Sequence, residues 1–143
     1  MNIRLLKTDA EILDSFRVMK VLRPHLVQED YLEKVRRQQE NDGYSLLAAI
    51  DDHGEISALA GFRIAEFMAW GKILYIDDLI TDPDQKRKGF AGALLDRLDA
   101  EAREAGCDGI HLDTGHQRHD AHRLYLNKGF TLSSHHMSKK LTL

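Results

Sequence analysis

A disulfide bond within the chain is excluded, because Cys107 is the only cysteine among the 143 residues. A protein without a disulfide framework is typical of a reducing compartment, so we expect a cytoplasmic location. The sequence also has no apolar run near the roughly 20 residues of a membrane span, and its first residues lack the apolar region of a signal peptide. We therefore expect no membrane partner.

Positive charge is not in excess either, since 20 basic residues stand against 23 acidic ones, for a net charge of −3. Proteins that bind nucleic acid generally carry surplus positive charge on one face, so this balance argues against such a partner. The chain has only two prolines and no Gly/Ser-rich run or internal repeat that would mark a linker. The composition, 43% hydrophobic and 30% charged, predicts a single globular domain over residues 1–143.

Hydrophobic periodicity predicts a mixture of strands and helices along the chain. The first helix should begin at Thr8, where Glu11 completes a capping box, and should end before Pro24. The order of elements predicts an α/β (α+β) fold whose mostly antiparallel sheet has a parallel pair at its middle. We expect strands near residues 3–7, 44–50, 56–66, 73–81, 109–114, 130–132 and 136–141, and further helices at 28–40, after Gly89 and at 120–128.

The stretch Leu74–Leu98 runs from a strand through a basic glycine loop into a helix. The unpaired N–H groups of a first helical turn and the helix dipole together favour an anion at such a point. Lys86, Arg87 and Lys88 precede Gly89 in this loop, which matches neither the P-loop nor the dinucleotide glycine pattern. A tight strand-to-helix turn with solvated basic side chains is the alternative interpretation.

This loop and a later segment together resemble the GCN5-related N-acetyltransferase (GNAT) superfamily. The central signature of the superfamily, Arg/Gln-x-x-Gly-x-Gly/Ala, is similar to residues 86–91, Lys-Arg-Lys-Gly-Phe-Ala. The later signature, Ala-x-x-Phe/Leu-Tyr-x-x-x-Gly-Phe, is matched at Ala121, Leu124, Tyr125, Gly129 and Phe130. The order of the elements also agrees, so the resemblance covers nearly the whole chain.

The resemblance implies the GNAT fold, in which a mixed, mostly antiparallel sheet of six to seven strands is flanked by about four helices. It also implies acetyl-coenzyme A (acetyl-CoA) as co-substrate and direct transfer of its acetyl group to an amine acceptor. A splayed parallel pair, residues 73–81 against 109–114, would hold the pantetheine arm. Homodimers are common in the superfamily.

The cofactor-binding residues are implied by the same resemblance. Backbone amides of the loop and of the first helical turn would hold the pyrophosphate, while main-chain groups at the end of the preceding strand would bind pantetheine and polarise the thioester carbonyl. Two positions depart from the superfamily: Lys86 stands where Arg or Gln is usual, and Arg118 stands where Asn often contacts pantetheine. The implied binding residues are Leu79, Ile80, Thr81, Lys86, Arg87, Lys88, Gly89, Phe90, Ala91, Gly92 and Arg118.

Tyr125 is, by the resemblance, the general acid that protonates the leaving thiolate, and an aromatic core residue on an amphipathic helix is the alternative. Asp77 and Asp78 stand in an otherwise apolar strand, where a carboxylate without a partner is costly. We interpret Asp78 as the base or amine anchor and Asp77 as the second candidate, with their side chains on opposite faces of the strand. The alternative is that both bond to neighbouring backbone or pair with Arg63 or Arg123.

Other functions are compatible with the same residues. A noncatalytic acyl-CoA-binding sensor would use the loop without turnover, and an acyltransferase could use a nucleophile other than an amine. His116, His119 and His122 recur every three residues, but the resemblance implies no metal. The acceptor should lie against the first two helices and residues 67–72, which carry no signature that identifies it.

Overall fold

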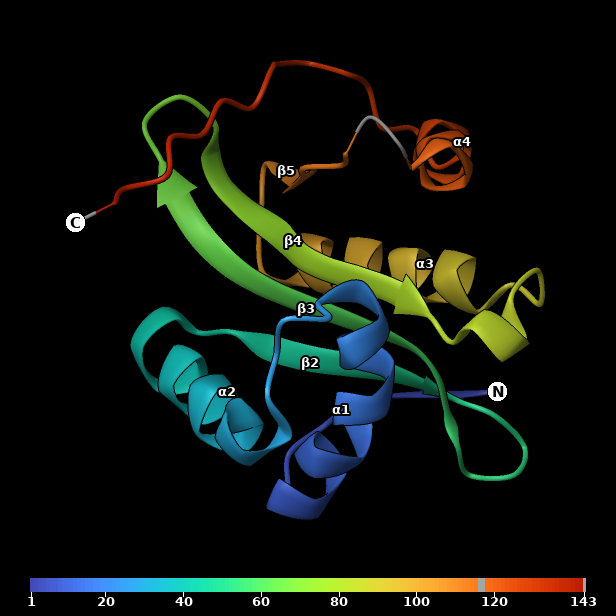
Figure 1. The fold of residues 1–143 in the computed structure, drawn as a ribbon. Coiled ribbons are helices and arrows are strands. Elements are labelled where there is room, and N and C mark those ends of the chain that lie inside the picture. The colour runs from blue at the N-terminus through green and yellow to red at the C-terminus, as the bar shows by residue number, and fades with distance from the viewer. Residues whose placement is uncertain (116–117, 143) are drawn as a thin grey trace. The chain divides into compact units, whose positions relative to one another are not determined.

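The computed structural model describes residues 1–115 and 118–142, and the chain forms two compact units, Met1–Leu112 and Asp113–Leu143. The first unit contains a five-stranded sheet with the order β1-β2-β3-β4-β5 (Figure 1). Neighbouring strands are antiparallel except β4 and β5, which are parallel. The strands are β1 (Asn2–Leu5), β2 (Ser45–Ile50), β3 (Ile56–Phe67), β4 (Gly71–Thr81) and β5 (Gly109–Leu112).

Helices cover both faces of this sheet. Figure 1 shows α1 (Asp9–Leu22) and α2 (Gln28–Asp42) on one face and α3 (Phe90–Glu104) on the other. The predicted capping box of α1 is present, because the Thr8 hydroxyl accepts from the Glu11 N–H and the Glu11 carboxylate accepts from the Thr8 N–H. The mixed α+β fold with one parallel strand pair is therefore confirmed. The expected place of this pair at the middle of the sheet is wrong for the described residues, because β5 is the last strand of the sheet.

The second unit contains the helix α4 (His119–Asn127), which is followed by Gly129 in the left-handed region at φ +90°. The strands expected at 130–132 and 136–141 are wrong, since residues 130–142 have no strand. Three apolar side chains of this segment, those of Leu132, Met137 and Leu141, are each more than four-fifths exposed. A strand needs a partner for its backbone and a surface for its side chains, and alternation in the sequence supplies neither. The prediction of a single domain over residues 1–143 stays a prediction.

The core between α1, α2 and the sheet contains two buried tyrosines. Tyr31 of α2 is 2% exposed and its hydroxyl lies 2.7 Å from the hydroxyl of Ser15 in α1. Tyr44, which precedes β2, is 5% exposed. Burial raises the pKa of Tyr31 to about 12, and burial with the neighbouring Asp78 carboxylate raises the pKa of Tyr44. Both phenols therefore remain protonated at neutral pH.

We expect the first unit to lose stability as the pH rises above 10. A tyrosine in the unfolded chain ionises near pH 10, whereas folded Tyr31 keeps its proton up to about pH 12. This contribution to stability is complete below pH 10 and is lost as the pH rises through the folded pKa, because the unfolded state then binds fewer protons. Urea unfolding between pH 9 and pH 11 should show a shallower loss for Tyr31→Phe than for the wild type. An identical slope would contradict the assignment.

None of the helices formed by residues 1–115 and 118–142 is both long enough and apolar enough to cross a bilayer.

Candidate functional site

The strand β4 contains a bulge at the two aspartates predicted from the sequence. Asp78 lies opposite Gly61 of β3, while Ile76 lies opposite Phe62, the next residue along β3. Asp77 is therefore an extra residue that has no opposite partner in the ladder. A bulge of this kind bends the strand and turns its side chains away from the regular alternation.

Asp78 is held by two donors from other elements. The Arg23 Nε atom donates to Oδ1 at 2.9 Å, and the Tyr44 hydroxyl donates to Oδ2 at 2.7 Å. Gly61 makes room for this arrangement, because a Cβ atom there would lie 1.9 Å from the Tyr44 hydroxyl oxygen and 2.6 Å from Oδ2 of Asp78. The Asp78 side chain is 12% exposed, so its charge is held inside the fold by a cation and a phenol.

Asp77 accepts both the Nε and Nη2 donors of Arg63, at 3.1 and 2.7 Å. Arg63 also lies over the ring of Tyr44, 5.4 Å from its centroid. The prediction that Asp77 and Asp78 point to opposite faces is wrong, because the bulge brings both carboxylates into one network around Tyr44. Of the alternatives, pairing with Arg63 is confirmed for Asp77.

Burial raises the pKa of the Asp77 carboxyl above its ordinary value, and the Arg63 guanidinium opposes this effect. A raised pKa brings a carboxylate closer to the range in which a general base works at neutral pH. This direction of the Asp77 pKa is the one that a proton acceptor requires.

Beyond the bulge, one edge of β4 is not paired with β5. The parallel pairing extends from Ile73 opposite Gly109 to Ile76 opposite Leu112, where β5 ends, while β4 continues to Thr81. Leu79, Ile80 and Thr81 pair with β3 on their other side. Within the first unit, this leaves main-chain groups at 78–81 to which an extended molecule can add as a strand. Cofactor binding by Leu79, Ile80 and Thr81 stays a prediction.

The loop after β4 leads directly to the start of α3. Asp82 caps a short 3₁₀ helix, η1 (Pro83–Gln85), by accepting from the Asp84 N–H. Lys86, Arg87 and Lys88 follow and are all exposed. Arg87 has φ +65° and Gly89 has φ +84°, so the backbone enters the left-handed region twice within three residues. Such alternation turns successive N–H groups into one concavity, an arrangement that binds anions.

The first turn of α3 has no side-chain cap, because its N-cap residue is Gly89 and no acidic residue lies in the turn. The N–H groups of Phe90, Ala91 and Gly92 are among those that a helix leaves without an intrahelical partner. A Cβ atom at Gly89 would meet nothing within 4 Å, so the space in front of the turn is open. Phe90, the first residue of the turn, is buried at 8% exposure. The loop and turn therefore fit a pyrophosphate.

Tyr125 and Arg118 belong to the second unit. Tyr125 lies on α4, half-buried, with its ring 5.8 Å from that of Phe130 in an edge-on arrangement. Burial raises the pKa of Tyr125, and Arg118, the N-cap residue of α4, partly opposes this. The phenol is thus protonated at neutral pH, as an acid must be. Its role as catalytic acid stays a prediction.

The histidines form no recognisable metal site in the described part of the chain, where no cluster of three or more His, Cys, Asp or Glu side chains could hold an ion. The rings of His119 and His122 lie 6.1 Å apart, and His122 contacts the Gly115 carbonyl at 2.8 Å. His116 lies outside the described residues.

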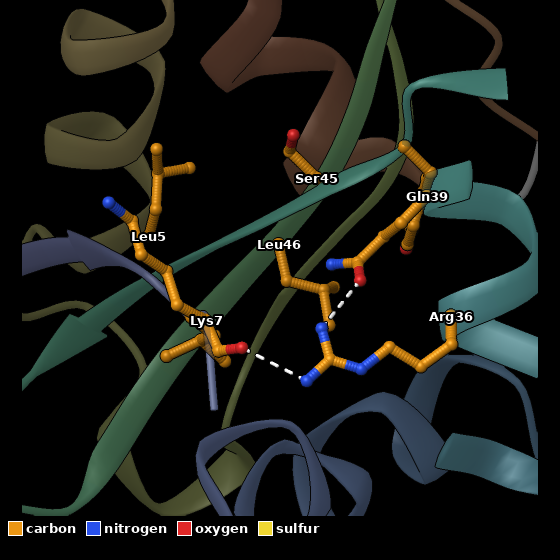
Figure 2. Close-up of a pocket in the computed structure, with 8 residues that line it drawn as sticks. Leu5, Lys7, Arg36, Gln39, Ser45 and Leu46 are labelled. Carbon is orange, nitrogen blue, oxygen red and sulfur yellow. Dashed lines mark hydrogen bonds between the residues drawn. The ribbon is translucent and has the colours of Figure 1, made fainter. Parts of the chain in front are cut away.

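A hollow of about 350 Å³ lies away from the loop, between α2 and the strands β1 and β2. Figure 2 shows Arg36 extending into it, with its guanidinium bonded to the Lys7 carbonyl and the Gln39 side chain. Arg36 also donates to Asp9. The Arg36 guanidinium already donates to acceptors of the protein, so we interpret this hollow as a structural contact between α2 and the sheet and not as a ligand site.

Three residues of the site were missed by sequence reasoning. The sequence pattern places Arg23 at the end of a helix, Tyr44 at the start of a strand and Gly61 inside the next strand. Only Gly61 carries a signal, because a strand interior rarely contains glycine without a close approach by another group. Arg23 and Tyr44 are ordinary residues for their places.

Comparison with known proteins identifies the family. Residues 10–130 match the model of the acetyltransferase (GNAT) family, so the chain belongs to this family of acyl-transferring proteins. Members use acetyl-CoA as co-substrate, together with an acceptor.

Two relatives and two solved structures are similar to the chain. The uncharacterized N-acetyltransferase YhdJ of Bacillus subtilis (strain 168) is 34% identical over 135 residues, 94% of each protein. An aminoalkylphosphonate N-acetyltransferase of Salmonella typhimurium (strain LT2) is 35% identical over 66 residues, 46% of this chain and 43% of that protein. The structure of a transcriptional regulator from Bacillus halodurans C-125 has a TM-score of 0.86 at 20% identity, covering 98% of this chain and 99% of the other. An acetyltransferase from Trypanosoma brucei has a TM-score of 0.80 at 21% identity, with the same coverage. At these identities the two structures show the fold alone.

Proposed function

We propose that this protein is an N-acetyltransferase that transfers the acetyl group of acetyl-CoA directly to an amine. The observation that supports this most is the continuous stretch from the β4 bulge to the first turn of α3. It combines an unpaired strand edge at Leu79–Thr81 with an uncapped helix start behind Gly89. The first can hold an extended pantetheine arm and the second its pyrophosphate.

In the proposed reaction, the amine nitrogen attacks the thioester carbonyl carbon and forms the C–N bond. A main-chain N–H near Leu79 donates to the carbonyl oxygen as negative charge develops there. The C–S bond then breaks, and Tyr125 gives its proton to the departing thiolate. The proton released by the amine passes to the aspartates of the bulge, with Asp78 the first candidate for the base or amine anchor and Asp77 the second.

The acceptor is proposed only as an amine. Two relatives are named as N-acetyltransferases, and one of these acts on aminoalkylphosphonates by its name. Asp77 and Asp78 are already paired with Arg63 and Arg23, so their charges are balanced within the network and do not select a cationic amine.

A free-thiol assay tests this function. The protein is incubated with acetyl-CoA and a panel that includes aminoalkylphosphonates, polyamines, amino acids and peptides with a free amino terminus, together with hydroxyl and hydrazine nucleophiles. We expect thiol release that depends on an amine, with the acetylated product identified by mass. Tight acetyl-CoA binding without thiol release for any acceptor would instead indicate a noncatalytic sensor, and release only with the other nucleophiles would change the acceptor class.

A further inference from the structure

The bulge in β4 requires a group outside the sheet to satisfy its backbone. Asp77 has no opposite residue on β3, and a buried carbonyl without a donor costs free energy. Arg23 supplies that donor, because its Nη2 atom lies 2.8 Å from the Asp77 carbonyl oxygen. The same guanidinium donates through Nε to the Asp78 carboxylate at 2.9 Å. One planar group therefore holds the main chain of one bulge residue and the side chain of the next.

Arg23 is itself fixed at the point where α1 ends. It is the C-cap residue of α1, and its N–H donates to the Met19 carbonyl. Tyr44 holds the other oxygen of Asp78, in the space left open by Gly61. The bulge is thus held by Arg23 at the end of α1 and by Tyr44 just before β2, in the space that Gly61 of β3 leaves open.

We propose that Arg23 is a positioning residue for acyl transfer, holding the β4 bulge so that the N–H groups beyond it point at the thioester carbonyl. This inference rests on the proposed function, since Leu79 is the proposed oxyanion donor and immediately follows the clamped pair. A small displacement of a group that stabilises the transition state is sufficient to slow a reaction substantially. Arg23 acts through the bulge, with Tyr44 as its support, while the proposed pyrophosphate contacts belong to the loop and α3.

Arg36 provides a matched control. It also joins a main-chain carbonyl, that of Lys7, to an aspartate, Asp9, and its side chain is 40% exposed, against 41% for Arg23. Figure 2 shows its contacts with Lys7 and Gln39 in the hollow at β1, β2 and α2. Replacing either arginine by glutamine removes one guanidinium from a carbonyl and an aspartate. Asp78 is 12% exposed and Asp9 is 68% exposed, so Arg23→Gln leaves the more buried carboxylate without its cation.

We expect Arg23→Gln to lower kcat by about 100-fold while the acetyl-CoA Kd rises by less than about tenfold, because the pyrophosphate contacts of the loop and α3 are untouched and only the pantetheine contacts at Leu79–Thr81 shift. Arg36→Gln should leave kcat within about twofold of the wild type, although it also loses some thermal stability. Equal effects of both variants on kcat would overturn the proposal, and so would a parallel loss of acetyl-CoA affinity in Arg23→Gln.

Two further measurements keep the test decisive. Arg23→Lys keeps the charge but lacks the planar fork that reaches both acceptors, so we expect it to fold and still to lose most of the kcat. A full wild-type kcat in Arg23→Lys would refute the claim that the planar guanidinium must reach both acceptors. Amide NMR shifts of residues 78–81 need no turnover: Arg23→Gln should move them and Arg36→Gln should not. A wild type without thiol release would refute the proposed function, whereas unmoved amide shifts in Arg23→Gln would refute the clamp.

Discussion

Replacing Gly89 by glutamate should abolish acetyl-CoA binding without unfolding the protein. Gly89 lies at φ +84° in front of the uncapped turn of α3, with no protein atom within 4 Å of the position a Cβ would occupy. A glutamate there would place bulk and negative charge where the pyrophosphate is proposed to lie, next to N–H groups that it could itself cap. We expect the Kd for acetyl-CoA, measured by calorimetry, to rise at least about 100-fold, since charged contacts of this kind dominate phosphate binding.

Gly54 offers the control for this substitution. It lies in the turn between β2 and β3 at φ +81°, and a Cβ atom there would again meet nothing within 4 Å. Gly54→Glu therefore introduces similar backbone strain and the same charge. Both variants should lose similar stability, and only Gly89→Glu should lose acetyl-CoA. Retained affinity in Gly89→Glu would remove the loop as the pyrophosphate site.

Replacing Tyr125 by phenylalanine should lower turnover far more than cofactor binding. The phenol is protonated at neutral pH, because burial raises its pKa, and it is the proposed proton donor to the thiolate. Loss of a general acid typically costs between about 100-fold and 10,000-fold in rate, so we expect kcat to fall by about 100-fold or more. Steady-state kinetics with acetyl-CoA and the best acceptor, alongside the Kd from calorimetry, would measure both quantities.

The pH profile distinguishes an acid from a packed aromatic ring. An acid must carry its proton, so wild-type kcat should fall as the pH rises through the raised pKa of Tyr125, and Tyr125→Phe should lack this decrease. Tyr31→Phe is the control, because Tyr31 is another buried phenol of raised pKa, located in the core between α1 and α2. An unchanged kcat in Tyr125→Phe would exclude the residue as the acid.

Local signals predicted much of the fold correctly. The capping box at Thr8 and Glu11 specified the start of α1, because both of its hydrogen bonds are made within four residues. The buried face of α3 was also predictable, since Leu94, Leu98 and Ala102 recur at helical spacing and all are buried. The segment after α4 could not be predicted in this way. Its alternating residues resemble a strand, but strand formation depends on a distant partner.

The bulge, too, was predictable only in part, because its geometry depends on contacts between distant residues. Two adjacent aspartates in an apolar strand indicated a special position, but regular alternation assigned them to opposite faces. Only the register between β3 and β4 shows that Asp77 is an extra residue and that both carboxylates join one network. That register depends on contacts between residues far apart in the sequence.

The sequence by itself determined the family signature at residues 86–91 and 121–130, and with it the strand, glycine loop and helix that can bind an anion. These features are local, since the φ of a glycine and the free N–H groups of a helix start depend on neighbouring residues. The tertiary structure alone decided how the bulge of β4 is held. Arg23, Tyr44, Gly61 and Asp78 come from four separate elements, and only folding brings their donors and acceptors within hydrogen-bonding distance.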